Sequence, residues 1–480
     1  DVERSRGLGD VYKRQDLCII GGGSGGLSVA AGAAQMGANV VLFEGGEMGG
    51  DCLNYGCVPS KALLAAAKAA HHANGHPEMG VTGTASVDFA KAKDHVASVI
   101  ASIAPHDSPE RFRGLGVDVI EDYARFTGPR RVEGGGITVE ARYTVVATGS
   151  SAFIPPIPGL AETPFHTNES IFNDRTLPQH LIVIGGGPIG VEMAQAHCRL
   201  GARVTLIEAA PSIMIRDDAA LVALLRDRLK ADGITLIEGA GVTAVSGTNG
   251  AVKVEVEGRG TIEGSHLLVA VGRKPNLDKL NLEAAGIETG RGGITTDRRL
   301  RSSNRRVFAI GDAAGRQQFT HVAGYHAGIV IRNTLFRLPA RIDDRAVPWV
   351  TYTDPELAHV GLTEGEAEKQ GITTRRVEAD LADNDRARAE GRTEGRVVAL
   401  TDKSGRIIGA SILGAGAGEL IQPWILAINN GMKIGAMASM IAPYPTMGEA
   451  SKRAAGSYFT PTLFSERTRR LVRFMLKLPF

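Results

Sequence analysis

Two cysteines five positions apart form the clearest chemical group in the chain. Cys52 and Cys57 lie in the segment GGDCLNYGCVPSK, which leads into an Ala- and Leu-rich helical stretch. Such a pair can close a small strained disulfide, and a helix N-terminus stabilises a thiolate and lowers its pKa. Lys61 follows Cys57 by four positions and shares its helix face, so its ammonium could lie beside that sulfur or beside a bound ring. No second Cys pair or Cys/His cluster completes a zinc site. We therefore expect a redox-active pair and no bound metal.

A glycine-rich turn precedes the cysteines. The expected order is strand Asp16–Ile20, a turn with Gly21, Gly23 and Gly26, an Ala-rich helix to about Met36, strand Asn39–Phe43 and Glu44. Such a turn lets the backbone approach a pyrophosphate, and the free N–H groups of the helix that follows favour anions. One such turn alone is weak evidence, because glycine-rich turns join strands to helices in many folds.

The same arrangement returns in the middle of the chain. Its parts are strand Leu181–Ile184, Gly185, Gly187 and Gly190 of the turn, helix Val191–Leu200, strand Arg203–Ile207 and Glu208. In both copies the acid follows the first glycine by 23 positions, where it can accept hydrogen bonds from an adenosine ribose. The repeat predicts two βαβ units and two bound dinucleotides.

The residues around Glu208 also predict which nicotinamide cofactor is used. The Glu208 carboxylate would repel a 2′-phosphate, and the two alanines Ala209 and Ala210 follow it. We therefore expect NAD(H) in preference to NADP(H). Arg216 is the nearby group that would weaken this preference.

The composition is consistent with a multidomain protein and excludes some classes. The 480 residues suffice for about three domains. The 54 Lys and Arg against 52 Asp and Glu leave a net charge of +2, so we expect no nucleic-acid partner. Four cysteines do not make a secreted disulfide scaffold, and we expect a cytoplasmic protein. Residues 1–15 show neither periodicity nor a cap, and we interpret them as a non-native or disordered leader.

Three other predicted strands also end at a glycine. Strand Tyr143–Ala147 leads into Thr148 and Gly149, strand Leu267–Val271 into Gly272, and strand Val307–Ile310 into Gly311 and Asp312. From about Arg345 the sequence pattern changes. Val397–Leu400 and Ile407–Leu413, separated by Asp-Lys-Ser-Gly, predict an antiparallel hairpin. The C-terminal part is therefore expected to be an α+β domain.

The segment GGDCLNYGCVPSKAL resembles the redox-disulfide signature of the pyridine nucleotide–disulfide oxidoreductases, the family of dihydrolipoamide dehydrogenase, glutathione reductase and mercuric reductase. The likeness extends from about Asp16 to about Thr460. It implies an α/β fold with two Rossmann-like dinucleotide-binding domains, for FAD and NAD(P), plus a C-terminal α+β dimerisation domain in a homodimer. The implied domains are residues 16–155 with 281–345 for FAD, 156–280 for NAD(P), and 346–480 for dimerisation, with a basic C-terminal helix.

The resemblance also implies roles for single residues. FAD would be held by Gly21, Gly23, Gly26, Glu44, Gly50, Lys61, Thr148, Gly149, Gly311, Asp312 and His321. The nicotinamide dinucleotide would be held by Gly185, Gly187, Gly190, Glu208 and Gly272. Glu192 matches the glutamate that pairs with the family lysine, here Lys61. Hydride would pass from NADH through FAD to the Cys52–Cys57 disulfide. Cys57 would be the charge-transfer thiolate beside the flavin, and Cys52 the thiol that meets the acceptor.

One motif departs from the family pattern. Where the family places a His, then Pro-Thr, then a Glu five residues after the His, this chain has Tyr444 and Glu449. That His exchanges protons with a dithiol substrate at the partner subunit's cysteines, whereas a Tyr with a pKa near 10 is a poor base at neutral pH. A Tyr at this position of the motif resembles the pattern of the mercuric reductases. No cysteine follows Cys198 to deliver a metal ion, and we expect no N-terminal metal-binding domain.

Three functions therefore compete. The first is an NADH-dependent flavoprotein disulfide reductase whose acceptor is a metal ion such as the mercuric ion, a quinone or a small disulfide. The second is dihydrolipoamide dehydrogenase. The third is a flavin redox sensor or interaction protein with little turnover.

Two features carry open alternatives. His321 and His326 are expected to begin a helix near the flavin in a positioning role, with a substitute acid or metal contact as the alternative. The C-terminal segment sets Arg469, Arg470, Arg473 and Lys477 opposite Leu471, Phe474, Met475 and Leu478. We expect this amphipathic helix to dock on the protein's own surface, with an anionic membrane as the alternative.

Overall fold

The computed structural model describes residues 11–479, which form parts of two compact units. The first unit comprises residues 1–185, 196–207 and 240–342, and the second comprises residues 186–195, 208–239 and 343–480. The three-domain boundaries expected from the sequence stay a prediction.

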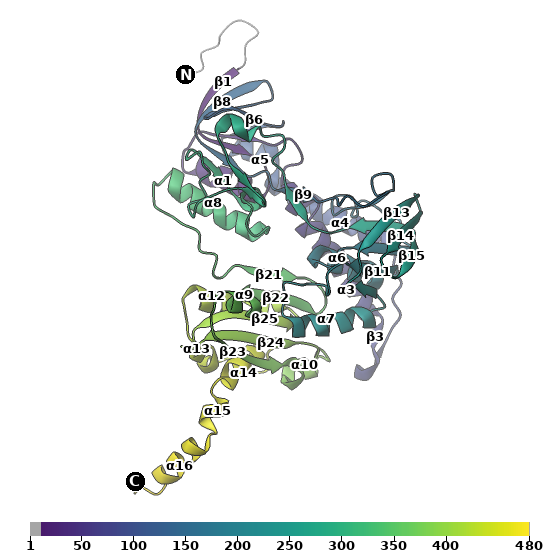
Figure 1. The fold of residues 1–480 in the computed structure, drawn as a ribbon, viewed down its shortest axis with the longest axis vertical. Helices are drawn as coiled ribbons and strands as arrows, with labels where there is room; N and C mark the ends of the chain where they lie inside the picture. Colours follow the sequence, from purple (N-terminus) through teal and green to yellow (C-terminus); the bar gives the residue numbers. More distant parts are fainter. Residues whose placement is uncertain (1–10, 480) are drawn as a thin grey trace. The chain divides into compact units, whose positions relative to one another are not determined.

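A seven-stranded sheet is the centre of the first unit, with the order β5-β2-β1-β8-β7-β6 and with β20 paired to β8 (Figure 1). Its strands are β1 (Val11–Ile20), β2 (Val40–Phe43), β5 (Val117–Ile120), β6 (Arg125–Gly128), β7 (Arg131–Gly134), β8 (Ile137–Val146) and β20 (Val307–Ala309). Strand β1 pairs in parallel with β2 and β8, whereas β7 pairs antiparallel with β6 and β8. The α/β fold expected from the βαβ pattern is confirmed.

Alternate residues of β1 face opposite sides of this sheet. Leu17 and Ile19 belong to the core that α1 (Ser24–Gln35) and α8 (Thr320–Thr334) share with the sheet, whereas Cys18 belongs to the core on the opposite face. Both cores are fully apolar, which explains why β1 and β2 appear in the sequence as continuous hydrophobic runs. Cys18 is fully buried and fills space in this core.

Strand β1 begins earlier than its sequence suggests. Val11 pairs with Ile137, and the same register continues to Ile20 opposite Val146. The expectation that the ordered fold begins at Asp16 is therefore wrong for residues 11–15. The sequence does not indicate a strand here, because these residues are largely polar. Lys13 and Gln15 bond the Asp118 carboxylate at 3.0 and 3.2 Å. Residues 1–10 of the predicted leader lie outside the described residues.

The remaining elements of the first unit include further helices, several short strands and the strands of the second repeat. Its other helices are α2 (Gly50–Asn54), α3 (Cys57–Ala73), α4 (Phe89–Ile103) and α5 (Pro109–Gly114). Its other strands are β3 (Gly75–His76), β4 (Val81–Thr82), β9 (Ser150–Ala152), β10 (His180–Ile184), β13 (Val242–Thr248), β14 (Ala251–Val256), β15 (Gly260–Gly264), β16 (His266–Val269), β17 (Arg273–Pro275), β18 (Thr289–Gly290) and β19 (Gly293–Ile294). Strand β10 pairs in parallel with β16 and with β11 (Arg203–Glu208). Helix α6 (Pro188–Arg199), of which residues 188–195 belong to the second unit, follows β10 and precedes β11 along the chain and completes the predicted second βαβ unit.

The second unit contains a five-stranded antiparallel sheet of order β21-β22-β25-β24-β23. Its strands are β21 (Pro348–Thr351), β22 (Glu356–Gly361), β23 (Thr374–Asp380), β24 (Arg396–Asp402) and β25 (Ile407–Gly414), and β12 (Thr235–Glu238) also lies in this unit. Its helices are α7 (Ala219–Ala231), α9 (Glu364–Lys369), α10 (Asp385–Ala389), α11 (Ala417–Leu420), α12 (Gln422–Asn429), α13 (Ile434–Ser439), α14 (Glu449–Ser457), α15 (Thr460–Leu463) and α16 (Glu466–Met475). The predicted hairpin is confirmed as β24 and β25.

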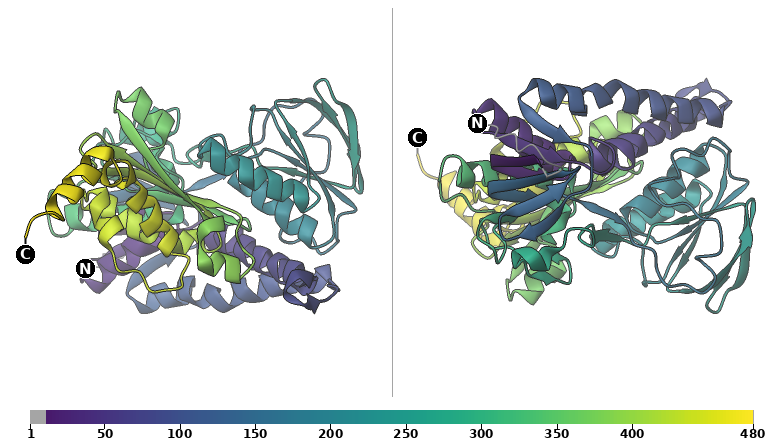
Figure 2. Two further views of the ribbon diagram at one scale, coloured as in Figure 1. Left: turned by 90° about the horizontal axis from the view of Figure 1, so that it is seen from below. Right: turned by 90° about the horizontal axis from the view of Figure 1, so that it is seen from above.

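Helices α12 and α14 pack against the five-stranded sheet (Figure 2). Trp424 of α12 is fully buried in the core, and its indole N–H donates to the Ser451 hydroxyl of α14 at 3.1 Å. The core that Trp424 shares with Val397 and Ile412 fixes these helices on the sheet. The C-terminal part is thus an α+β domain, as expected.

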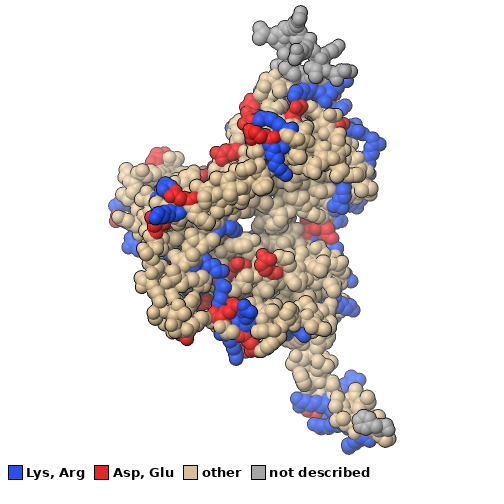
Figure 3. All heavy atoms as spheres, turned by 180° about the vertical axis from the view of Figure 1, so that it is seen from behind, with Lys and Arg blue, Asp and Glu red and all other residues tan. Residues whose placement is uncertain are grey.

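The C-terminal helix α16 departs from expectation. Its apolar residues Leu471, Phe474 and Met475 are exposed, and Lys and Arg side chains gather around it (Figure 3). The expectation that this face docks on the chain's own surface is wrong for the residues that the structure describes. Within residues 11–479, no helix combines the length and the hydropathy that a membrane crossing requires.

Candidate active site

The two cysteines lie at the junction of two helices. Cys52 is in the short helix α2, and Cys57 is the first residue of α3, after the N-cap residue Gly56. Both are free thiols in this structure, and the two thiols are hydrogen bonded to each other. The Sγ atom of Cys57 also lies 3.4 Å from the Oγ1 atom of Thr320, which begins α8. The structure therefore brings the predicted pair together.

The surroundings of the pair make its two thiols unequal acids. The hydrogen bond from Cys52 is the main cause that lowers the pKa of Cys57 to about 6, helped by the Thr320 hydroxyl and the Lys61 ammonium and opposed by burial. Its partner responds in the opposite direction: the hydrogen bond to Cys57 and burial raise the pKa of Cys52. Of the two thiols, Cys57 is therefore the one that is favoured as the thiolate.

Three helix N-termini converge on these sulfurs. Cys57 is the first residue of α3, Thr320 begins α8, and Ser24, whose side chain hydrogen-bonds Cys52, begins α1. The free N–H groups and the dipole of a helix N-terminus stabilise a nearby negative charge. A thiolate at this place is stabilised by both backbone and side chains.

The glycine turn after β1 is tied directly to the cysteine segment. The Gly49 N–H donates to the carbonyl of Gly22 at 2.9 Å, and Gly23 forms a parallel bridge with Gly49. Gly50 has a φ of 60°, and a Cβ placed on it would lie 2.8 Å from the Gly23 Cα atom. Only glycine allows this close approach, which couples the first dinucleotide-type turn to α2.

The two glycine turns have the same local geometry. Gly21 and Gly185 both have a φ of 110°, and a Cβ on either would lie 2.4 Å from a carbonyl oxygen of the neighbouring strand end, that of Ala147 or Ala270. A Cβ on Gly187 would meet no atom within 4 Å. The first glycine of each turn is therefore required by the backbone, whereas at Gly187 the absent side chain leaves the backbone accessible.

The two acids that end the second strands are anchored in the same way. Glu44 accepts hydrogen bonds from the N–H groups of Gly22 and Gly46 at 2.5 and 2.7 Å. In the second unit, Glu208 accepts from Gly186 and Ala210 at 2.6 and 2.7 Å. Each carboxylate lies beside the backbone of its own glycine turn, and the role of these acids toward an adenosine ribose stays a prediction.

A polar network links α2 to the strand end that carries Asp312. The Arg273 guanidinium lies 2.8 Å from the Asp51 carboxylate and donates to both the hydroxyl and the carbonyl of Ser150 at 2.8 and 2.6 Å. The Ser150 hydroxyl donates in turn to Asp312 at 2.5 Å. Burial raises the pKa of Asp312, opposed by the Ser150 hydrogen bond and by the charge of Arg273.

Neither Ser150 nor Arg273 was predicted as a site residue. Ser150 directly follows the predicted Thr148 and Gly149, and Arg273 directly follows the predicted Gly272. The short β9–β17 pairing places Arg273 opposite Ala152 and so brings these two strand ends together. The signal that could have found them is their position immediately after strand-ending glycines.

His321 and His326 begin a helix as expected, and His326 has a positioning contact. It is fully buried, and its Nδ1 atom accepts the N–H of Gly311 at 3.2 Å. Burial lowers the pKa of His326 to about 4, helped by the charge of Arg316. The ring is therefore neutral at neutral pH. His321 stacks on Phe319 with ring centroids 5.3 Å apart, and its role toward FAD stays a prediction.

The residues predicted from the C-terminal motif lie in the second unit. Tyr444 is 71% exposed, and its hydroxyl donates to Asp385 at 3.3 Å. The Asp385 charge is the main cause that raises the pKa of Tyr444. Glu449 begins α14 and accepts the N–H of Thr446 at 3.5 Å.

Glu192 is buried in the second unit, where its carboxylate accepts the N–H of Tyr352 at 2.8 Å. Lys61 belongs to the first unit and donates to the Ser60 hydroxyl at 3.3 Å. The pairing of Glu192 with Lys61 stays a prediction. Gly190 is buried in α6, and Gly272 has a φ of 141° at the end of its strand.

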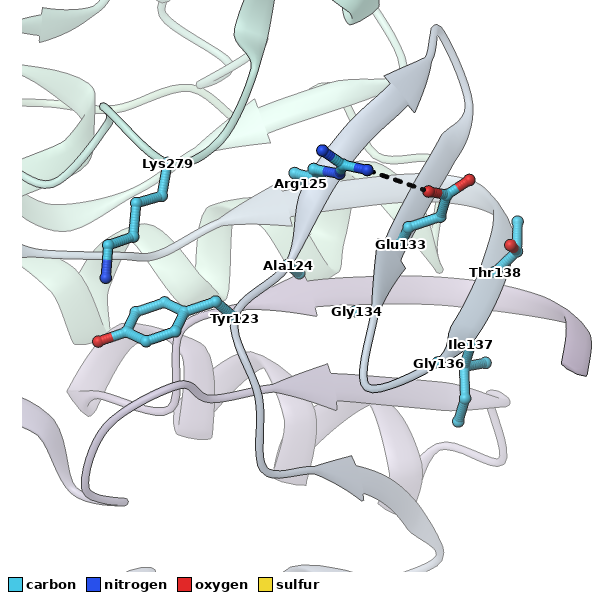
Figure 4. A pocket seen from close by; sticks show the side chains of 9 residues that line it. All are labelled: Tyr123, Ala124, Arg125, Glu133, Gly134, Gly136, Ile137, Thr138 and Lys279. Carbon is cyan, nitrogen blue, oxygen red and sulfur yellow. Dashed lines mark ion pairs between the residues drawn. The ribbon is translucent and has the colours of Figure 1, made fainter. Parts of the chain in front are cut away.

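A pocket elsewhere in the first unit contains none of the predicted site residues. Its lining residues include Tyr123, Arg125, Glu133 and Lys279 (Figure 4). The Lys279 ammonium lies over the Tyr123 ring, 3.6 Å from the centroid, and Arg125 pairs with Glu133 at 3.9 Å. These contacts satisfy the charges of the pocket locally.

The comparisons with known proteins agree with the cysteine and glycine motifs. The pyridine nucleotide-disulphide oxidoreductase family matches residues 15–327, and the dimerisation domain of that family matches residues 347–455. The chain belongs to this family. Its cofactors are therefore FAD and a pyridine nucleotide, and it carries the domain through which the family forms homodimers.

Curated relatives and solved structures cover most of the chain. The mercuric reductase of Staphylococcus aureus is 35% identical over 92% of this chain and 82% of that one. The dihydrolipoyl dehydrogenase of Geobacillus stearothermophilus is 34% identical over 93% and 97%. The HOCl-induced flavoprotein disulfide reductase RclA of Escherichia coli, solved as a Cu(II) complex, has a TM-score of 0.83 at 29% identity, covering 91% and 98%. LpdA of Mycobacterium tuberculosis has a TM-score of 0.84 at 28% identity, covering 93% and 99%.

This pyridine nucleotide-disulphide oxidoreductase is an FAD-dependent NAD(P)H:disulfide oxidoreductase. Its residues fit the flavin nucleotide at one place in particular. The Oγ1 atom of Thr148 is buried and has no hydrogen-bond partner among the described residues. A buried hydroxyl normally has a partner, and an FAD oxygen would supply one beside Gly149 and Asp312.

Proposed function

We propose that this oxidoreductase passes electrons from NADH, through the Cys52–Cys57 pair, to a thiophilic metal ion, either mercuric or cupric. Bound FAD would supply the hydride acceptor through which the two electrons of NADH reach the disulfide. NADH gives up a hydride and becomes NAD⁺, and this hydride with one proton from solvent converts the disulfide into two thiols. One Hg²⁺ then takes two electrons from the thiols, or two Cu²⁺ take one each, so that the disulfide forms again and two protons are released.

The asymmetry of the cysteine pair supports the thiol chemistry. Cys57, with its pKa lowered to about 6, holds the negative charge between the pair and the helix N-termini. Cys52 keeps its proton until a partner reaches it, because its pKa is raised. The pair therefore suits the family assignment of Cys57 as the thiolate beside the flavin and Cys52 as the thiol that meets the acceptor. Thiolate sulfur is also a preferred ligand of soft metal ions.

The observation that carries the acceptor class is Tyr444. A dithiol substrate must lose protons, and general bases for this task have a pKa near the working pH. Tyr444 is unsuited, because the charge of Asp385 raises its pKa further above the ordinary value of about 10. A metal ion carries no proton and needs no such base. The mercuric reductase of S. aureus and the Cu(II) complex of E. coli RclA fit this acceptor class.

The preference for NADH over NADPH rests on Glu208 and Arg216. The Glu208 carboxylate, fixed by two backbone N–H groups, would repel a 2′-phosphate. The Arg216 guanidinium lies over the Trp349 ring, 5.2 Å from the centroid. This contact holds it on the ring, where it does not bind a 2′-phosphate. We expect a higher kcat/KM with NADH, and a location in the cytoplasm where NADH is supplied.

An anaerobic titration tests the electron path first. Adding NADH to the oxidised holoenzyme should release two titratable thiols per chain in the wild type and none in Cys52→Ala. Cys198→Ala is the matched control, since Cys198 lies in α6 and not at the pair. If the flavin is reduced and no thiols appear in the wild type, the proposal is wrong.

Acceptor turnover then separates the competing functions. We expect NADH oxidation with Hg²⁺ or Cu²⁺ to exceed that with lipoamide by at least about tenfold, and Cys52→Ala to abolish it. Faster turnover with lipoamide would support dihydrolipoamide dehydrogenase instead. Negligible turnover with every acceptor, quinones and small disulfides included, would support the redox sensor.

A further inference from the structure

Three side chains from distant parts of the first unit direct their ligand atoms at one point. The Nε2 atoms of His166 and His266 lie 3.4 and 3.1 Å from the same carboxylate oxygen, Oδ2 of Asp174. All three atoms lie within 4.8 Å of one another. His266 lies 100 positions beyond His166 in the sequence, so no local spacing predicts this cluster. We expected no metal site from the sequence.

The backbone fixes the two histidines side by side. His166 forms a parallel bridge with Leu268, donating to the Leu267 carbonyl at 2.7 Å and accepting the Val269 N–H at 2.8 Å. His266 precedes Leu268 by two positions, so its side chain lies on the same face as that of His166. The two rings are stacked, with centroids 6.0 Å apart and 13° between their planes.

A tight turn brings Asp174 back to the two rings. The Ile171 N–H donates to Thr167, and the Asn173 N–H donates to Ser170, which folds the segment onto itself. The other carboxylate oxygen of Asp174, Oδ1, accepts the N–H of Thr176 at 2.8 Å. Only Oδ2 therefore remains for the histidines.

A serine hydroxyl orients each ring. The Ser265 hydroxyl donates to the His180 carbonyl at 3.2 Å and lies 2.9 Å from Nδ1 of His266. Because that hydroxyl proton is already used, the contact needs the Nδ1–H form of His266, and the lone pair of Nε2 then faces Asp174. Ser170 lies 3.2 Å from Nδ1 of His166 in the equivalent place. Metal-binding histidines are held in this way, with the second ring nitrogen donating to an outer partner.

In the tautomers that carry the proton on Nδ1, both Nε2 atoms and Oδ2 of Asp174 are acceptors that face one another, and a metal ion between them satisfies all three atoms. Tetrahedral ligands with bonds of about 2.05 Å to zinc lie about 3.3 Å apart, close to the observed 3.1 and 3.4 Å. The three side chains are 17 to 24% exposed, which leaves room for an ion to enter from solvent.

Lys93 is the charged neighbour of this cluster. Its ammonium donates to the Ile171 carbonyl at 2.8 Å. Burial lowers the pKa of Lys93 to about 8, opposed by the charge of Asp174. The ammonium is thus held by the backbone of the turn, and Oδ2 of Asp174 remains directed at the imidazoles.

We propose that His166, Asp174 and His266 bind a divalent ion of the Zn²⁺ class, with water as the fourth ligand. Imidazole nitrogens and a carboxylate oxygen suit such an ion. The site would hold the turn of residues 167–173 against β16. Asn168 in that turn donates to the Asp51 carboxylate and to the Tyr55 carbonyl at 3.1 and 3.2 Å. Metal binding would therefore brace the segment that carries Cys52, without any exchange of electrons at the ion.

The test must separate this site from the cysteine thiolates. The holoenzyme carrying Cys52→Ser and Cys57→Ser is treated with chelator, exchanged into metal-free buffer and titrated with Zn²⁺ in a calorimeter. We expect one Zn²⁺ per chain. Adding His266→Gln or Asp174→Asn should weaken binding at least about 100-fold, whereas His95→Ala, an exposed histidine on α4, should leave it unchanged. Co²⁺ should give the absorption bands of a tetrahedral ion only when the cluster is intact.

Two outcomes would overturn the proposal. No binding in the double-serine protein would mean that the cluster is held by protons alone. Equal Zn²⁺ affinity in His266→Gln would place the ion elsewhere. Ser265→Ala guards against unfolding as an explanation, since it keeps all three ligands and should weaken binding about 10-fold through loss of the outer contact. FAD content and dimer elution report folding for each variant. Zn²⁺ binding is independent of the acceptor, so this test and that of the proposed function can fail separately.

Discussion

The sulfur of Cys57 and the hydroxyl of Thr320 lie 3.4 Å apart although 263 positions separate them in the sequence. This contact joins the first residue of α3 to the first residue of α8. Thr320 hydrogen-bonds both cysteines and lowers the pKa of each. The acidity of the redox pair therefore depends on a side chain from a distant helix as well as on its own segment.

Thr320→Val should raise the pKa of Cys57. A hydrogen bond to a charged group contributes about 1.5–3 kcal/mol, and one pKa unit corresponds to about 1.4 kcal/mol. Because the other contacts of Cys57 remain, we expect a shift of about one unit from the present value of about 6. The thiolate fraction at pH 7 would then fall from about nine-tenths to about half. The pH dependence of the thiolate–flavin absorbance in the two-electron-reduced enzyme measures this shift.

Thr320→Ser is the matched control, because it keeps the hydroxyl and removes only a methyl group. Its titration should overlay that of the wild type. An unshifted curve in Thr320→Val would show that the Cys52 hydrogen bond and Lys61 alone set the pKa of Cys57.

His326 should make the flavin-binding unit sensitive to acid. Its pKa is lowered to about 4 in the fold, so the folded state binds fewer protons than the unfolded state between about pH 6.5 and 4. The free energy of unfolding is therefore not reduced by His326 above pH 6.5. It falls as the pH drops from about 6.5 to 4, by at most about 3 kcal/mol. Protonation of Nδ1 would also remove the acceptor of the Gly311 N–H.

His326→Gln removes this titration and keeps a side-chain acceptor. We expect it to cost some stability at pH 8 and to flatten the decline between pH 6.5 and 4. Flavin fluorescence during acid titration follows release of the cofactor. Parallel curves for the variant and the wild type would contradict a role for His326 in the acid response.

Local sequence patterns predicted the parts of the site that are contiguous in the chain. The glycine turns, the anchored acids Glu44 and Glu208, and the entry of Cys57 into a helix N-terminus all follow from residue types within one βαβ unit or one helix start. Backbone geometry dictates these features, since only glycine tolerates the φ of 110° at Gly21 and the close approach at Gly50.

Contacts between distant segments could not be predicted in this way. Thr320, Arg273 and Ser150 are ordinary residues in sequence, and only the pairing of β9 with β17 and the placement of α8 give them roles. The His166–Asp174–His266 cluster depends on one parallel bridge to β16. The start of β1 was missed because its first residues are polar and bond Asp118 across the sheet edge.

Tyr444→His should create turnover with a dithiol substrate. Histidine has a pKa near 6.5, and a positioned base contributes about 10²- to 10⁴-fold. With Glu449 retained in the same motif, we expect dihydrolipoamide oxidation to rise at least about 10-fold. The gain should titrate with a pKa near that of histidine. Steady-state rates from pH 5.5 to 8.5 measure it.

Tyr444→Phe serves as the control, since it removes the hydroxyl that bonds Asp385 and adds no base. It should show no gain, and neither variant should change turnover with Hg²⁺ or Cu²⁺ by more than about twofold. A large gain in Tyr444→Phe would mean that Tyr444 obstructs the dithiol and that the missing base is not the cause.

Arg273 should control FAD affinity through the strand ends that it joins. Its guanidinium contacts Asp51 at 2.8 Å and lies 4.0 Å from Asp312, with both hydrogen bonds to Ser150 between them. Arg273→Met would leave two carboxylates near one another without their cation. Removal of one partner from a buried pair costs about 3–5 kcal/mol, and we expect about 2 here because Asp51 is 37% exposed. Such a loss corresponds to FAD binding weakened by about 30-fold.

Arg273→Lys distinguishes charge from geometry. Lysine keeps the positive charge but cannot reach Asp51 and Ser150 with one planar group, so it should recover less than half of the lost binding free energy. Lys274→Met, the neighbouring exposed residue paired with Asp278, should bind FAD as the wild type does. Flavin fluorescence quenching with the apoprotein gives all four affinities. Wild-type FAD affinity in Arg273→Met would mean that Ser150 alone holds Asp312 in place. Full recovery of FAD affinity in Arg273→Lys would mean that the positive charge alone matters and the planar geometry of arginine does not.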